Sequence, residues 1–206
     1  MKPELLGAVT ALAGGSAAGG YALYSHFSGS SFSEALKGTL LSLEGEEDKS
    51  RWEKRLTKLK GNKDSLVDSL KAVANKNNLD ATWSDVQAWC KDNLKEKVSK
   101  DNQKLFDNVQ LYCTFNIGDK LSNKIDPNTG DSDNKWKKVF EKLGQADSSK
   151  LDQALVEIKS KNNQSGDAGN KAIKQWCTTV YESPFKLPKD KSFEYAESYC
   201  VEIANG

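Results

Sequence analysis

Large apolar residues recur along the chain at the intervals of an amphipathic helix. The spacing i, i+4, i+7 places side chains on one face of a helix. Two triplets with this spacing lie in the first half of the chain and two in the second: Trp52, Leu56, Leu59; Leu66, Leu70, Val73; Trp136, Phe140, Leu143; and Leu151, Leu155, Ile158. Alternation of β-branched residues is scarce. The pattern therefore predicts an all-α fold.

A Trp-Cys dipeptide followed by a Tyr-Cys dipeptide also occurs once in each half. The positions are Trp89-Cys90 with Tyr112-Cys113, and Trp176-Cys177 with Tyr199-Cys200. The two cysteines are 23 residues apart in both cases. Together with the apolar triplets, these features recur in the same order at an offset of 84 to 87 residues. A constant offset indicates an internal repeat, so we predict two similar helical units.

Glycines and polar segments divide each unit into helices. We predict a short lead-in helix in each unit, near residues 31–44 and 116–125, followed by four further helices. The residues that favour helix starts are Ser50, Asp133 or Asn134, Asp190, and Thr82 with Asp85, which together resemble a capping box.

The paired cysteines are placed to meet across helical hairpins. A helix stop and start lie halfway between Cys90 and Cys113, and again between Cys177 and Cys200. Residues equidistant from the turn of an antiparallel hairpin lie at the same height. Our hypothesis is one disulfide per unit, Cys90–Cys113 and Cys177–Cys200. Sequence leaves other pairings open, and four free thiols are the alternative.

Charge and metal-ligand content narrow the range of partners. Thirty Lys and Arg residues face 29 Asp and Glu residues, with both signs mixed along the chain. No basic stretch indicates nucleic acid as a partner. The single histidine, His26, lies beside the apolar N-terminus, and no two cysteines are close in sequence. We therefore predict no metal site and no cofactor.

The N-terminal segment differs in kind from the rest. Residues 5–24 contain no charged residue and are long enough for one membrane span as a helix. An uncleaved anchor, a cleaved signal peptide and a buried soluble helix are the three interpretations, and the anchor is preferred. Lys2 on one side and the acidic residues of 34–48 on the other favour a single-pass membrane protein with its N-terminus inside and its body outside.

These features give a predicted domain plan. Residues 1–27 form the anchor or signal segment, 28–125 the first helical unit with its lead-in helices, 126–134 a linker, and 135–206 the second unit. The linker contains acidic residues, but its spacing departs from that of a calcium loop at Gly130 and at the twelfth position. A turn followed by a helix cap is the preferred interpretation.

Residue content argues against an enzyme. With its only histidine next to the apolar segment, the body offers no serine or cysteine triad. No glycine-rich phosphate loop has the required spacing. Carboxylates are plentiful, but nothing in the sequence distinguishes a pair of them. We predict no catalytic residues.

The whole chain resembles the multi-copy membrane-anchored surface-type proteins of haemotropic mycoplasmas. The resemblance lies in the N-terminus "MKPELLGAVTALAGGSAAGGY", in "SRWEKRL" and "NKWKKVF", in "AWCKDNL" and "QWCTTV", and in the two "YC" positions. It implies membrane anchoring through residues 5–24, surface exposure, and contact with an unknown host or cell-surface protein. We therefore expect a non-enzymatic surface-displayed interaction or antigen module. The alternative is a membrane-tethered intracellular scaffold or small-ligand binder with free thiols.

Overall fold

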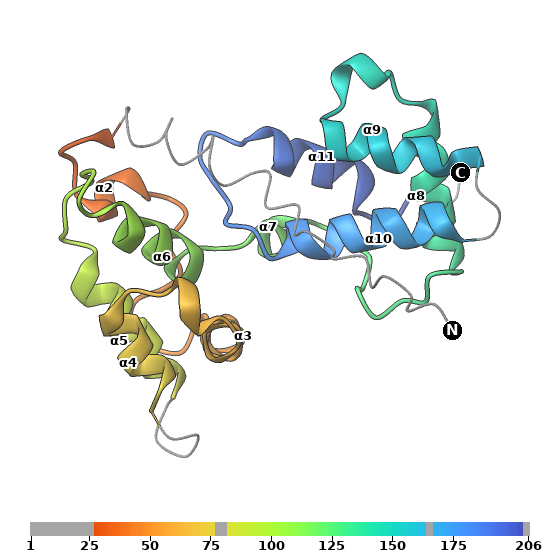
Figure 1. The fold of residues 1–206 in the computed structure, drawn as a ribbon. Coiled ribbons are helices and arrows are strands. Elements are labelled where there is room, and N and C mark those ends of the chain that lie inside the picture. Colours follow the sequence, from red (N-terminus) through yellow and green to blue (C-terminus); the bar gives the residue numbers. More distant parts are fainter. Residues whose placement is uncertain (1–26, 77–81, 164–166, 204–206) are drawn as a thin grey trace, which may run out of the picture.

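The computed structural model describes residues 27–76, 82–163 and 167–203. Every regular element in these ranges is a helix, as predicted (Figure 1). Two disulfide bonds, Cys90–Cys113 and Cys177–Cys200, are present. The first half contains α2 (Phe32–Ala35), α3 (Lys49–Gly61), η1 (Lys63–Ser65), α4 (Asp68–Ala74), α5 (Trp83–Asn93) and α6 (Gln103–Cys113). The second contains α7 (Ile117–Lys120), α8 (Asn134–Gln145), η2 (Ser148–Lys150), α9 (Gln153–Lys159), η3 (Ser160–Asn163), α10 (Ala168–Tyr181) and α11 (Lys191–Tyr199).

The predicted N-terminal segment, residues 5–24, lies outside the described residues. Among the helices of the described ranges, none combines the length and the apolar character that crossing a membrane requires.

Helix starts follow the capping signals of the sequence. Thr82 and Asp85 form the predicted capping box of α5. Asp133 accepts a hydrogen bond from the backbone amide of Lys135, and Asp190 accepts one from that of Phe193. These carboxylates satisfy amide groups that the first turn of a helix leaves unpaired. Helix α3 is different, because it begins at Lys49, one residue before the predicted cap Ser50.

The lead-in helices are shorter than predicted, at four residues each. After α2 the chain turns at Gly38, whose φ of +81° favours glycine. The next residues then pair with the end of α6: Leu41 donates to the carbonyl of Cys113, and Phe115 donates to that of Thr39. This pairing takes backbone groups that a longer helix would need. The prediction of a helix to residue 44 was wrong for this reason.

The second half of the chain repeats these backbone contacts. Its equivalent hydrogen bonds are Ile125 to Cys200 and Glu202 to Asn123. A second set also recurs, with Phe32 donating to Glu96 and Val98 to Ser30 in the first half, and Ile117 to Ser183 and Phe185 to Phe115 in the second. The offsets are again 84 to 87 residues. Helix α3 packs against α5, as α8 packs against α10.

Buried apolar side chains form two clusters. The first cluster runs from Phe32 to Cys113 and the second from Ile117 to Cys200. Each contains one fully buried tryptophan of the repeated triplets, Trp52 or Trp136. In Figure 1, α2 to α6 lie in one group of helices and α7 to α11 in another.

The cluster boundary lies earlier in the chain than the predicted linker at 126–134. Ile117 and Ile125, which the predicted domain plan placed in the first unit, are buried in the second cluster. The backbone of Ile125 pairs with Cys200, which holds this segment against the second half. Phe115 is partly buried against both clusters.

Candidate functional site

The four cysteines form two buried disulfides with the predicted pairing. Cys90 of α5 is bonded to Cys113 of α6, and their Cα atoms are 5.6 Å apart. Cys177 of α10 is bonded to Cys200 at the end of α11, with Cα atoms 5.5 Å apart. All four side chains have no exposed surface. Each bond therefore lies inside its own cluster, where it closes a helical hairpin.

Aromatic residues precede all four bonded cysteines in the sequence. Trp89 and Tyr112, the neighbours of the first pair of cysteines, are buried, and Trp89 donates its indole N–H to Ser69 at 3.0 Å. Tyr199 is buried beside Cys200, and Trp176 packs against the second cluster. A reactive thiol or disulfide needs access to solvent. The buried geometry indicates a structural role for these bonds.

Charged side chains gather where the two clusters meet. We call this region the junction and define it by Arg51, Arg55, Lys58, Phe115, Asn116, Asp119 and Glu182. The three basic residues come from α3, in the first half of the chain. Asp119 lies in α7, and Glu182 follows α10. The junction thus joins segments that are more than sixty residues apart in sequence.

Arg55 is the most buried charge of the junction, with 2% of its surface exposed. Its Nη2 donates to the carbonyl oxygen of Thr114 at 3.0 Å and to Oδ2 of Asp119 at 3.1 Å. Hydrogen bonds between ionised groups are stronger than neutral ones. A buried cation without such partners would be strongly unfavourable.

Asp119 has two roles in this geometry. Its carboxylate accepts a hydrogen bond from the backbone amide of Asn116 at 2.9 Å, which completes the capping box of α7. It also forms ion pairs with Arg55 and, at 3.6 Å, with Arg51. Arg51 is held in turn by Asp48 at 2.5 Å. One carboxylate therefore starts a helix of the second half and binds two cations of the first.

Lys58 extends the junction to α10. Its ammonium donates to the backbone carbonyl of Glu182 at 2.8 Å and lies 3.5 Å from the carboxylate of the same residue. Glu182 also accepts a hydrogen bond from Asn116 at 3.3 Å. Burial lowers the pKa of Lys58, and the nearby Arg55 lowers it further, whereas Glu182 raises it. A lysine near the C-terminus of a helix satisfies a carbonyl left unpaired there.

Phe115 fills the centre of the junction between two cations. The ammonium of Lys120 lies 3.4 Å from the ring centroid, and the guanidinium of Arg51 lies 5.3 Å from it. Cations over an aromatic face are attracted by the ring quadrupole. The ring is partly buried and packs against both clusters.

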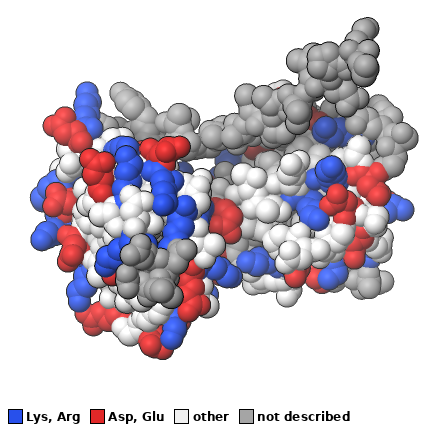
Figure 2. Space-filling view, turned by 60° about the horizontal axis from the view of Figure 1, so that its bottom comes forward, with Lys and Arg blue, Asp and Glu red and all other residues white. Residues whose placement is uncertain are grey.

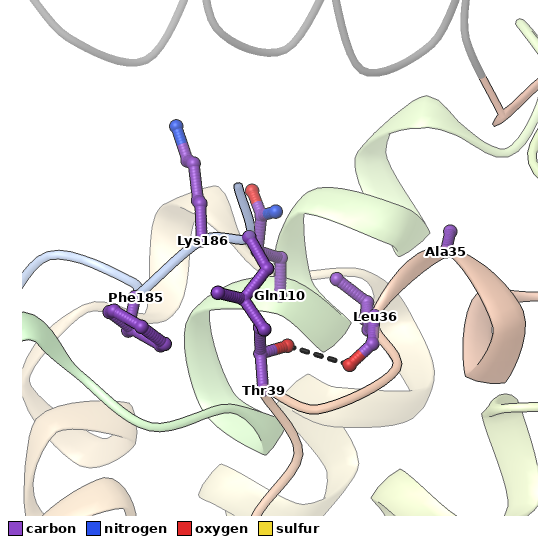
Figure 3. A pocket seen from close by; sticks show the side chains of 7 residues that line it. Ala35, Leu36, Thr39, Gln110, Phe185 and Lys186 are labelled. Atoms are coloured by element: carbon purple, nitrogen blue, oxygen red, sulfur yellow. Dashed lines mark hydrogen bonds between the residues drawn. The ribbon is translucent and has the colours of Figure 1, made fainter. Parts of the chain in front are cut away.

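Two hollows border the junction. The smaller is a notch of about 10 Å³, close to the space that one water needs. In Figure 3, Phe185 and Lys186 of the loop after α10 lie beside Leu36 and Thr39 of the segment after α2, with Gln110 of α6 behind. Thr39 donates its hydroxyl to the carbonyl of Leu36 at 2.7 Å.

The larger hollow is an open groove along α3. Its lining consists of Ser50, Glu53, Lys54, Thr57, Lys58 and Glu182. One wall therefore belongs to the first half of the chain and Glu182 to the second. The lining mixes both charge signs with hydroxyls and contains no pair of groups within the geometry of a nucleophile and its base.

The segment 126–134 forms a turn and a helix cap, as preferred over a calcium loop. Asp126 accepts a hydrogen bond from the amide of Asn128, and Asp133 caps α8. Asp131 instead pairs with Lys174 at 2.8 Å, and this hydrogen bond lowers the pKa of Asp131. In the described ranges, no group of three or more His, Cys, Asp or Glu residues is placed to hold a metal ion.

Sequence reasoning identified the cysteines but missed Arg55 and Asp119. Arg55 looked like one of many solvated charges on a polar helix. A usable signal was present, because Val139 occupies the equivalent position in the second half at an offset of 84. A charge in one copy where the other copy is apolar indicates an unusual environment.

Comparisons of the chain with protein-family models, with curated proteins and with solved structures gave no match.

Proposed function

We propose that the chain is a non-enzymatic interaction or antigen module displayed at a cell surface and held there by its N-terminal segment. The observation that carries this proposal is the pair of buried disulfides. Such bonds form and persist in oxidising environments and are rare in the cytosol. They favour a body on the outer side of the membrane, in agreement with the charge bias around residues 5–24.

We also propose that the body consists of two copies of one helical unit. The repeated order of helices, the two hairpin disulfides and the backbone hydrogen bonds with offsets of 84 to 87 residues support this. A unit of this size buries limited apolar area. One disulfide in each unit compensates for that limit.

The surface of the protein supports a binding role more than an enzymatic one. Lys, Arg, Asp and Glu are intermixed on the face drawn in Figure 2, without a large area of one sign. Leu187, at 42%, is the exposed large apolar residue of the described ranges. A mixed polar surface suits a soluble ectodomain and gives no electrostatic preference for nucleic acid. The resemblance to surface-type proteins of haemotropic mycoplasmas favours a host or cell-surface protein as the partner.

Thiol labelling on cells tests the location of the body. A membrane-impermeant maleimide is applied to intact cells that express the natural chain or the Lys104→Cys variant, whose new thiol lies at an exposed position of α6. We expect no labelling of the natural chain without reductant and labelling of the variant on intact cells. The natural chain should gain four labels only after denaturation and reduction.

The opposite result would favour the intracellular alternative. If lysed cells show four reactive thiols without reductant, and the Lys104→Cys variant is labelled only after lysis, the body lies in a reducing compartment. Limited proteolysis of intact cells provides an independent readout. Residues 50–206 should be cleaved from outside if the proposal is correct.

A further inference from the structure

The two halves of the chain differ most clearly in how their short lead-in helices are used. Ser31 and Glu34 start α2 with a capping box, and Asn116 and Asp119 start α7 with another at an offset of 85. Glu34 is exposed, and its pKa is lowered by hydrogen bonds from the amide and the hydroxyl of Ser31. Asp119 makes the equivalent contact and also binds Arg55 of the first cluster. The second lead-in helix therefore has a long-range contact in addition to its local one.

Arg55 is the matching difference in the first half. Its counterpart Val139 is fully buried in the second cluster, as the repeated apolar pattern requires. Arg55 is also buried, but its guanidinium reaches out of α3 to Thr114 and Asp119. A buried cation costs desolvation energy that apolar residues do not. The desolvation cost of burying Arg55 is accounted for if the contact of Arg55 with the second half of the chain has a role.

We infer that Arg55 is a latch that holds the two units in one fixed orientation, so that the body moves as a single rigid object. This rests on the two-unit organisation proposed above and not on display at the cell surface. The guanidinium binds the carbonyl of Thr114, at the end of the first unit, and the carboxylate of Asp119, at the start of the second. Both ends of the connecting segment are thereby fixed to α3.

Other contacts across the junction are weaker candidates for this role. Lys58 and Glu182 have side chains that are 21% and 57% exposed. Ion pairs in contact with solvent are screened and contribute little. Arg51 is 34% exposed and shares its charge between Asp48 and Asp119. Arg55 is the buried cation among them, and its Nη2 bridges two acceptors, the carbonyl of Thr114 and the carboxylate of Asp119.

The latch also determines the shape of the groove along α3. Ser50, Glu53, Lys54 and Thr57 form one side and Glu182 the other. Because these residues belong to different units, the separation of the walls depends on the orientation that Arg55 fixes. A partner that contacts both walls would bind to a preorganised surface.

Residual dipolar couplings of backbone amides test the latch on the full chain. One alignment tensor should fit the amides of both units in the natural protein. In Arg55→Met, which removes the charge and keeps a similar length, each unit should fit its own tensor, and the two tensors should differ. Lys54→Met is the matched control, since it removes an exposed charge from the same helix, and it should retain a common tensor.

A second variant keeps the test decisive if Arg55→Met fails to fold. Asp119→Asn removes the charge of the partner but keeps an oxygen that can accept from the Asn116 amide, so α7 retains its cap. Its two tensors should diverge in the same way, by a smaller amount. The latch is refuted if the natural chain already needs two tensors. It is also refuted if a single tensor fits both units in Asp119→Asn and in any Arg55→Met protein that folds. Neither result would bear on which side of the membrane the body lies.

Discussion

Replacing the Cys90–Cys113 bond by two alanines should lower the free energy of unfolding by about 3.4 kcal/mol. The magnitude comes from the loop that the bond closes, because its cysteines are 23 residues apart, and a cross-link limits the entropy of the unfolded chain by an amount that grows with loop length. The Cys177–Cys200 bond closes a loop of the same separation. The two replacements should therefore have nearly equal effects, since all four side chains are equally buried.

Urea unfolding followed by circular dichroism and tryptophan fluorescence measures this effect. The slope of the free energy against urea should rise in each variant, because an unfolded chain without the cross-link exposes more surface. Thermal unfolding adds information on cooperativity. A loss of this size lowers the midpoint by about 14–27 °C if one unit unfolds alone, and by about 7–14 °C if the whole chain unfolds together.

A loss below about 1 kcal/mol in either variant would contradict the loop-entropy estimate, because loop entropy alone predicts more. A difference of more than about 2 kcal/mol between the two losses would contradict it as well, since equal loops in equivalent hairpins cannot account for such a difference. The natural chain treated with an alkylating agent but no reductant is the control. Its mass should not change, because all four cysteines are bonded.

Three further predictions concern packing and pH. Gly169→Ala should lower the free energy of unfolding by roughly 1–3 kcal/mol, because a Cβ there would lie 2.2 Å from ring atoms of Phe140. Gly144→Ala is the control: a Cβ there would meet no side chain within 4 Å, so the change should be neutral or stabilising by up to about 1 kcal/mol. Tyr112→Phe should not destabilise the protein, because the buried Tyr112 hydroxyl has no hydrogen-bond partner among the described residues. Tyr181→Phe should lower the free energy of unfolding by about 1 kcal/mol, because it removes the donor to the buried backbone carbonyl of Cys200. Urea midpoints check both pairs, and equal effects within either pair would contradict the packing argument. Burial raises the pKa of both phenols, so the unfolded chain releases protons that the folded chain keeps, and stability should fall as pH rises above about 10. A pH series should show a smaller fall for Tyr112→Phe than for the natural chain, and an identical fall would exclude this role of Tyr112.

Local signals in the sequence were sufficient to predict several of the helix starts. The capping box of Thr82 and Asp85 and the caps Asp133 and Asp190 act on amides two or three residues away. Such contacts require no knowledge of the rest of the chain. The pairing of the cysteines was also predictable, because a hairpin with its turn at the midpoint brings equidistant residues together.

The length of the lead-in helices was not a local property. Residues 36–44 lie in a segment that could continue α2, but Leu41 pairs with Cys113 and Thr39 with Phe115. These partners are more than seventy residues away in sequence. Backbone groups that find partners in another part of the chain do not need to form a helix.

Neighbouring or regularly spaced residues were enough to predict an all-α fold, the order of its helices and the preferred pairing of the cysteines, because helical periodicity, capping and repeat spacing are local or regular features. The packing of Ile117 and Ile125 with the second cluster and the contact of Arg55 with Asp119 became visible in the tertiary structure alone. The ion pair spans 64 residues and depends on how α3 and α7 approach each other. The sequence does not show whether an arginine on a polar helix is surrounded by water or by a carboxylate. This depends on whether the side chain is buried, and tertiary packing decides that.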